Sequence, residues 1–190
     1  MPSIRSIKYL TQDELRRLLG AIDSKRDKAM FLLAYRHGLR ASEVGMLQVE
    51  DINTTTGRVR FERLKHSLGG EQPMQPDETK AVKAWLKERT NNTPCLFPSQ
   101  RGLPISRFTL DKLIKTYGQK AKLPPDKCHF HVLKHSICTH LSEAGADVRF
   151  IQDWVGHVKI ENTVIYTQIT SRAREEQARK FFASPMIVGT

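Results

Sequence analysis

The sequence predicts a mainly α-helical domain with one small antiparallel β-sheet, an α+β fold. Apolar residues recur at helical spacing along most of the 190 residues, and one short central stretch alternates as a strand does. Glycine and proline residues separate these periodic segments, and the sequence shows no internal repeat. The chain length corresponds to roughly one domain.

The N-terminal part is expected to hold three helices. Thr11–Glu14 has the pattern of a capping box and is followed by an apolar stripe. A second helix is expected from about Arg26 to His37, where Gly38 ends it. A short third helix is expected over Ala41–Leu47.

The middle of the chain is expected to form the sheet. Val49–Ile52 is expected to be extended, and Arg58–Leu64 alternates as a half-buried strand should. Ser67–Gly70 has the composition of a hairpin turn that leads into a short strand near Gln72–Gln75.

The second half is expected to be helical again. The expected helices begin near Asp77 and then span Ser106–Lys120, His131–Ala144, Asp147–Val155, Thr163–Tyr166 and about Ser171–Phe182. On the helix that begins at His131, the stripe with Leu133 and Ile137 is expected to be buried. Phe150 and Trp154 are expected to belong to the core.

The net charge is the most informative feature of the composition. Lys and Arg number 31 against 20 Asp and Glu, which gives a formal charge of +11. Such a basic domain attracts polyanions, because bound phosphates release their condensed counterions. This favours a nucleic-acid partner over a basic surface that is merely solvated. A membrane surface is less favoured, since no helix combines a basic face with an exposed aromatic face.

Nothing in the sequence indicates export or membrane insertion. No apolar run is long enough to cross a bilayer, and the N-terminus lacks the pattern of a secretory signal. The three cysteines, Cys95, Cys128 and Cys138, are an odd number, which favours reduced thiols. We therefore expect a cytoplasmic protein.

One crowded segment invites two interpretations. The potential metal ligands in it are Cys128, His129, His131, His135, Cys138 and His140. A zinc site is disfavoured, because Val132 stands where a zinc protease has glutamate and no two-cysteine knuckle is present. Alternatively, His131 and Lys134 share a helix face that suits a phosphate, although such residues often lie on solvated faces.

The flanking segments resemble the motif boxes of the tyrosine recombinase (phage integrase) family. These segments are Gly38–Glu43, the helix from His131, Ile151–His157 and Thr163–Tyr166, in the family's order and at its spacing. The resemblance runs from about Thr11 to Tyr166. It implies the fold of the family's catalytic domain and a site-specific recombinase that cuts and rejoins DNA.

The resemblance also implies a catalytic set. Its members are Arg40, Lys65, His131, Lys134, His157 and Tyr166. Tyr166 matches the nucleophile, which forms a 3′-phosphotyrosyl intermediate and frees a 5′ hydroxyl. No cofactor, ATP or metal ion is implied, because the phosphotyrosine bond retains the energy of the cut bond. His131 is our candidate general base for Tyr166, and Lys65 our candidate general acid for the leaving oxygen.

One position departs from the family pattern. Lys134 stands where the family usually has arginine, and an ammonium cannot grip two phosphate oxygens as a planar guanidinium does. Glu43 and His135 also fit the family pattern. We expect Glu43 to orient nearby cations and His135 to be a buried hydrogen-bonding residue. A charge stabilised by the helix N-terminus is an equally good account of Glu43.

The expected organisation is an N-terminal arm (1–10), a catalytic domain (11–170) and a C-terminal helix and tail (171–190) that docks on a neighbouring subunit or on its own domain. The family's usual additional helical domain is expected to be missing, either because a longer chain was cut or because this is a short form similar to fimbrial switch recombinases.

The expected partners are double-stranded DNA and further copies of the chain. We expect a homo-tetramer on DNA and a monomer or weak dimer when the protein is free. Two alternatives stay open: a catalytically weakened DNA-binding regulator, and type IB topoisomerase-like activity.

Overall fold

The structure, a computed structural model, describes residues 7–62, 69–90, 92–167, 175 and 179. The helices are α1 (Gln12–Gly20), α2 (Lys25–Arg36), α3 (Ala41–Met46), α4 (Pro76–Glu88), α5 (Arg107–Lys120), α6 (Val132–Glu143), α7 (Val148–Val155) and α8 (Glu161–Thr167), with 3-10 turns η1 (Val49–Asp51) and η2 (Pro125–Lys127). The prediction of a mainly helical domain with one small sheet is confirmed.

The sheet has three short antiparallel strands. β1 (Ile52–Asn53), β2 (Arg58–Phe61) and β3 (Gly70–Pro73) lie in that order, with β2 in the middle. On β2, Val59 and Phe61 are buried while Arg60 is exposed, which is the alternation that the sequence predicts.

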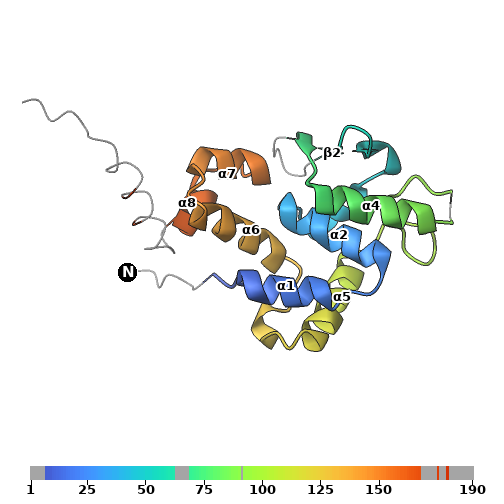
Figure 1. The fold of residues 1–190 in the computed structure, drawn as a ribbon, viewed down its shortest axis with the longest axis horizontal. Helices are drawn as coiled ribbons and strands as arrows, with labels where there is room; N and C mark the ends of the chain where they lie inside the picture. Colours follow the sequence, from blue (N-terminus) through green and yellow to red (C-terminus); the bar gives the residue numbers. More distant parts are fainter. Residues whose placement is uncertain (1–6, 63–68, 91, 168–174, 176–178, 180–190) are drawn as a thin grey trace, which may run out of the picture.

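Helix α2 is the centre of the domain. It packs against α4 on one side and against α6 on another, so it separates these two helices (Figure 1). Helices α7 and α8 pack on α6 and on each other, while α1 and α5 pack together at another end of the molecule. Residues of α2 such as Phe31 and Leu33 are completely buried, which is what a central helix requires.

The ends of the helices follow the sequence signals. Thr11 Oγ1 accepts from the Glu14 amide at 3.2 Å, and a Glu14 carboxylate oxygen accepts from the Thr11 amide at 2.8 Å, which confirms the capping box. Gly38 follows α2 with a φ of +59°, a left-handed conformation that favours glycine. No helix in the described part of the chain has the length and hydropathy of a membrane span.

Several expected boundaries are wrong. Val49–Asp51 forms the turn η1 rather than an extended strand, because the Asp51 carboxylate accepts from the Gln48 amide at 2.9 Å and curls the chain. Strand β3 begins at Gly70, which was expected in the turn. The expected hairpin tip at residues 67–68 and most of the expected last helix lie outside the described residues.

Two expectations about burial also need correction. Phe150 was expected in the core but is 48% exposed and stacks on the half-buried Trp154. Helix α6 is buried on most of its surface, so Lys134 and Cys138 are as inaccessible as the apolar stripe with Leu133. A helix that is covered by α2, α7 and α8 has little solvated face, and its sequence alone does not show this.

Replacing Gly38 by alanine should destabilise the domain. A Cβ atom at this position would lie 2.8 Å from Val155 Cγ1, and the left-handed φ adds backbone strain. We expect the free energy of unfolding to fall by about 1–3 kcal/mol in denaturant titrations. Gly20→Ala is the matched control, since a Cβ there meets no described atom within 4 Å, and it should change stability by less than about 0.5 kcal/mol. Equal effects of the two substitutions would contradict this account.

Candidate active site

Helix α6 holds a buried cation. Lys134 is 1% exposed, and its ammonium donates a hydrogen bond to the Val155 carbonyl at 2.7 Å. Val155 is the last residue of α7, where backbone carbonyls lack helical partners and carry partial negative charge. The C-terminus of α7 therefore stabilises the charge of Lys134 inside the domain.

Arg40 lies at the start of α3, directly after the turn at Gly38. Its guanidinium is 2.7 Å from a carboxylate oxygen of Glu43, and the other oxygen of Glu43 accepts from the Arg40 amide at 2.7 Å. Glu43 thus caps α3 and orients the arginine at once, so both interpretations of this residue hold. The Arg40 side chain is 32% exposed, whereas that of Glu43 is 1% exposed. A ligand can therefore reach the guanidinium from solvent.

His131 lies at the start of α6 among positive charges. Partial burial, together with the charges of Lys134 and then Arg40, lowers the pKa of His131 to about 4, even though solvent still reaches the residue. The charge of Arg107 acts on His131 in the same direction, so the first turn of α5 also faces this region. The structure thus brings Arg40, His131 and Lys134 into one electropositive region, as a phosphate site requires.

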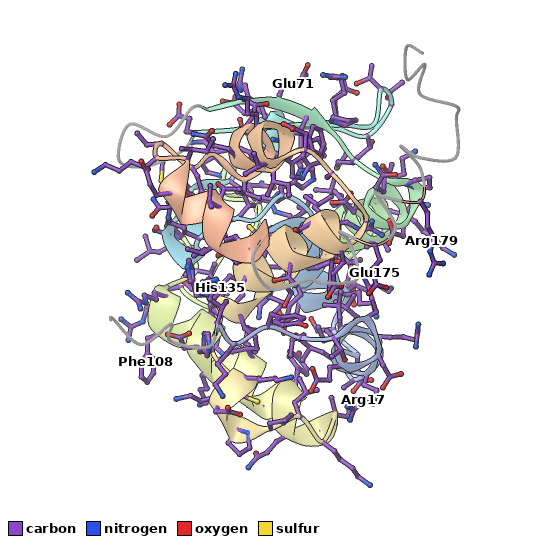
Figure 2. The ribbon with its side chains drawn as sticks, turned by 90° about the vertical axis from the view of Figure 1, so that its left-hand side faces the viewer. Arg17, Glu71, Phe108, His135, Glu175 and Arg179 are labelled. Carbon is purple, nitrogen blue, oxygen red and sulfur yellow. The ribbon has the colours of Figure 1, made fainter. Side chains whose placement is uncertain are left out.

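Tyr166 on α8 is enclosed by α6. Its hydroxyl lies 2.6 Å from His135 Nδ1, and the residue is only 2% exposed (His135 is labelled in Figure 2). The His131 ring contacts the His135 ring edge-on at 4.6 Å between centroids, and the His157 ring stacks on Tyr166 at 6.4 Å. Two imidazoles, those of His135 and His157, therefore contact the Tyr166 ring or hydroxyl, and His131 contacts the first of them.

Burial keeps the phenol of Tyr166 protonated. Burial, and next the Cys138 thiol, raises the pKa of Tyr166 above its usual value of 10. Burial, and next the neighbouring His131, lowers the pKa of His135 to about 4. An imidazole with so low a pKa stays neutral and does not take the proton of the phenol, whichever of the two groups donates the hydrogen bond. In this arrangement the Tyr166 hydroxyl is buried and not activated for attack, and no external phosphate can reach its oxygen.

The structure says less about the other two predicted catalytic residues, His157 and Lys65. His157 follows α7, and its Nδ1 lies 2.9 Å from the Thr163 hydroxyl, which orients the ring toward α8. Lys65 lies outside the described residues. Among the residues that the structure describes, no three His, Cys, Asp or Glu side chains are grouped to hold a metal ion.

A buried polar cluster that the sequence did not indicate supports the Arg40 turn. His37 and Glu78 are both fully buried, with Nε2 and Oε1 3.0 Å apart, and His37 Nδ1 lies 2.7 Å from the Gln72 amide oxygen. The Gln72 amide nitrogen donates to the Trp154 carbonyl at 2.8 Å. The cluster joins the end of α2, strand β3 and helix α7. Its members are far apart in sequence and match no motif, so only the structure reveals it.

The comparisons with known proteins agree with this geometry. The sequence model described as "Phage integrase family" matches residues 8–172. The chain belongs to this family. The match spans all the motif segments, from the Arg40 turn to Tyr166.

Individual relatives show which members of the family the chain is similar to. The chain is 37% identical to the type 1 fimbriae regulatory protein FimE of Escherichia coli K12 over 84% of this chain and 85% of the relative. It is 34% identical to the tyrosine recombinase XerA of Pyrococcus horikoshii over 96% of this chain and 64% of the relative. A crystal structure of a XerA recombinase matches with a TM-score of 0.81 and 27% identity, over 92% of this chain and 65% of that one. The chain is therefore a member of the tyrosine recombinases, a family of enzymes that cut and rejoin DNA.

The neutral imidazoles around Tyr166 should make the recombinase domain less stable in acid. His131 and His135 have pKa values of about 4 in the folded chain, against about 6.5 for an unfolded histidine. The unfolded chain therefore binds more protons between these values, and stability is complete above about pH 6.5 and falls as the pH is lowered toward 4.

Thermal unfolding midpoints between about pH 4.5 and 8 measure this effect. His135→Gln loses the contact with Tyr166 and should unfold earlier at neutral pH, but its midpoint should fall less steeply in acid, because one titrating group is gone. A midpoint that does not change over this range, or equal slopes in both proteins, would contradict the assignment of neutral imidazoles.

Proposed function

We propose that the chain is a site-specific recombinase that cuts double-stranded DNA with Tyr166, through a 3′-phosphotyrosyl intermediate and a free 5′ hydroxyl. One observation carries the proposal: the phenol of Tyr166 lies beside the imidazoles of His135 and His157. The His135 ring in turn contacts His131, on which the charges of Lys134 and Arg40 act. A tyrosine that served only to fill the core would not require imidazoles beside its ring and hydroxyl.

The cations have a clear task in this reaction. A phosphodiester is anionic, and attack at phosphorus gathers further charge on its free oxygens. Arg40, Lys134 and His157 are the donors that we assign to this charge, because fixed positive groups that bind it more tightly in the transition state lower the barrier. Lys65 is our candidate for protonating the leaving oxygen.

Tyr166 has to leave His135 before it can attack. Reacting atoms must come within about 3–3.5 Å of each other, and the phenolic oxygen is enclosed in the described arrangement. Helix α8 spans only seven residues and packs on α6 and α7, so these are the contacts that its displacement on DNA has to break. Near Arg40 and Lys134 the phenol meets a positive field that favours the phenolate. His131 is our candidate to accept the proton, because a bound phosphate would offset the cations that lower its pKa.

A catalytically weakened DNA-binding regulator is the second candidate. The buried phenol and the hydrogen bond from Lys134 to Val155 favour it, because neither group is free to meet a phosphate in this arrangement. Type IB topoisomerase-like activity is a third candidate, and it predicts relaxation of supercoils without recombinant product. The two experiments that follow separate the enzyme from the regulator.

A nicked suicide duplex should trap a covalent complex on Tyr166. We expect a slowly migrating band on a denaturing gel with the wild-type chain and none with Tyr166→Phe, because only the phenol oxygen can form the ester. Tyr117→Phe is the matched control, since that hydroxyl donates to Asp27 at 2.6 Å, outside the cluster around Tyr166. Tight DNA binding without a band in the wild-type chain would establish the regulator instead.

The charge of Lys134 should be needed for cleavage rather than for binding alone. Lys134→Gln should slow the formation of the covalent complex by about 100-fold, the usual effect of removing one donor to a developing anion. Lys134→Arg should keep most of the rate, because it retains the charge and offers two donors. Circular dichroism confirms that each variant is folded. Cleavage by Lys134→Gln at the wild-type rate would remove Lys134 from the phosphate site.

We also propose assembly as a homo-tetramer on DNA, from a chain that is a monomer or weak dimer when free. Residues 171–190 are our candidate for the segment that docks on a neighbouring copy, and they lie mostly outside the described residues. Light scattering of a chain truncated after Thr170, on target DNA, tests this. We expect smaller complexes than with the full chain, and unchanged assembly would reject the role of this segment.

A further inference from the structure

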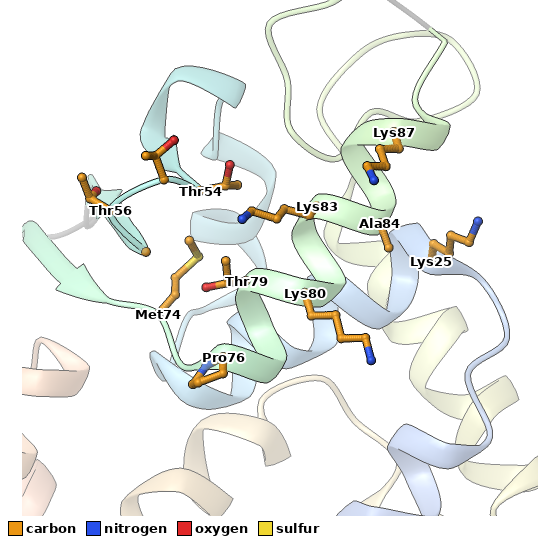
Figure 3. Close-up of a pocket in the computed structure, with 12 residues that line it drawn as sticks. Lys25, Thr54, Thr56, Met74, Pro76, Thr79, Lys80, Lys83, Ala84 and Lys87 are labelled. Atoms are coloured by element: carbon orange, nitrogen blue, oxygen red, sulfur yellow. The ribbon is translucent and has the colours of Figure 1, made fainter.

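A second basic surface lies on helix α4, which no catalytic candidate occupies. A hollow of about 780 Å³ opens between α4, the β1–β2 turn (54–57) and the start of α2 (Figure 3). Its lysines are Lys25, Lys80, Lys83 and Lys87, and three consecutive threonines of the turn, 54–56, line the opposite side. In Figure 3 the Lys83 side chain extends toward this turn. We call this surface the α4 groove.

The lysines of α4 have few counter-charges. Lys80, Lys83 and Lys87 are exposed, and among the described residues no carboxylate lies within 4 Å of their ammonium groups. Like charges three or four residues apart destabilise a helix by a few tenths of a kcal/mol per pair. Of the acidic residues of the same helix, Asp77 pairs with Arg36 at 2.9 Å and Glu78 is buried against His37. Glu88, at the end of α4, pairs with Lys25 at 3.7 Å, so it offsets one groove lysine and leaves the three lysines of α4 without a counter-charge among the described residues. An external anion would remove this repulsion.

The turn that faces these lysines can also receive a phosphate. Thr55 and Thr56 are exposed and carry hydroxyl donors, and Gly57 has a φ of +65° and no side chain to fill the hollow. Ammonium and hydroxyl groups are the usual contacts of a protein with the DNA backbone, and they read no sequence. The hollow is open to solvent, which suits a polymer better than a small ion.

The α4 groove and the candidate active site lie on different sides of the domain. Helix α2 separates α4 from α6, and Figure 1 shows α4 on one side of α2 and α6 with α8 on the other. In Figure 2, Phe108 at the start of α5 projects on the opposite side from α4. DNA has a persistence length of about 150 base pairs, so one short duplex cannot follow both surfaces without a large bending energy.

We propose that the α4 groove binds the phosphate backbone of a second DNA duplex, separate from the one at Tyr166. The proposal rests on the proposed function only in taking DNA as the partner, and it needs no cleavage. A protein that holds one duplex at each surface raises the local concentration of the second duplex near the active site. This is useful to an enzyme that joins two DNA segments.

The test is a bridging experiment with the cleavage-inactive Tyr166→Phe chain. One short duplex with the target site is attached to beads, and recovery of a second, labelled duplex of unrelated sequence is measured against salt. Lys80→Gln/Lys83→Gln/Lys87→Gln should need on the order of 10-fold more of the second duplex for equal recovery. Its log–log salt dependence should be shallower by about 2.7, which is 0.9 for each of three lost phosphate contacts.

A matched variant removes equal charge elsewhere. Lys8→Gln/Lys120→Gln/Lys122→Gln also replaces three exposed lysines, none of which lines the α4 groove, and it should bridge as the parent chain does. In the background with Tyr166 intact, the groove variant should still form the covalent complex on a short duplex at close to the wild-type rate. Light scattering without DNA checks that both variants have the same mass.

Three results would overturn the proposal. The first is that the parent chain holds one duplex only. The second is that the groove variant recovers the second duplex as well as its parent does. The third is that the control variant loses as much bridging as the groove variant, which would mean that total charge alone matters. Failure of the proposed cleavage would be distinguishable, since it leaves the bridging result untouched.

Discussion

Burial of α6 is the constraint on which the rest of the domain depends. A polar group inside a protein costs free energy unless it finds a partner, and α6 carries several such groups. Ser136 accepts from the Leu10 amide at 2.8 Å, and His140 Nδ1 lies 2.8 Å from the Tyr35 hydroxyl. Together with the contacts of Lys134 and His135, these bonds join α6 to the segment before α1 and to α2, α7 and α8. Polar contacts therefore assemble the domain around the helix that carries the catalytic candidates.

The same contacts explain why the candidate active site is closed in this arrangement. Lys134 and Tyr166 satisfy their polar groups within the domain, and each would have to exchange an internal partner for a phosphate. Arg40 differs, because it is held by Glu43 but stays accessible. DNA can thus meet the arginine first, with the buried groups following once α8 is displaced.

The sequence predicted the fold and the family better than it predicted the state of the site. Helix ends such as the Thr11 capping box and the Gly38 turn depend on neighbouring residues, so their pattern is visible in the sequence. Phe150 was assigned to the core against the preceding helix, yet in the described part of the chain it is 48% exposed. The contact of His135 with Tyr166, and the His37 cluster, join segments that only the tertiary fold brings together. No periodicity or spacing could have indicated them.

A strongly basic chain spends much of its time on DNA that is not its target, because phosphate contacts carry no sequence information. If Tyr166 is the nucleophile, as we propose, its enclosed hydroxyl leaves the strands unbroken in such encounters. Cleavage then depends on a rearrangement that only correct binding supplies, and breaks at random sites are avoided.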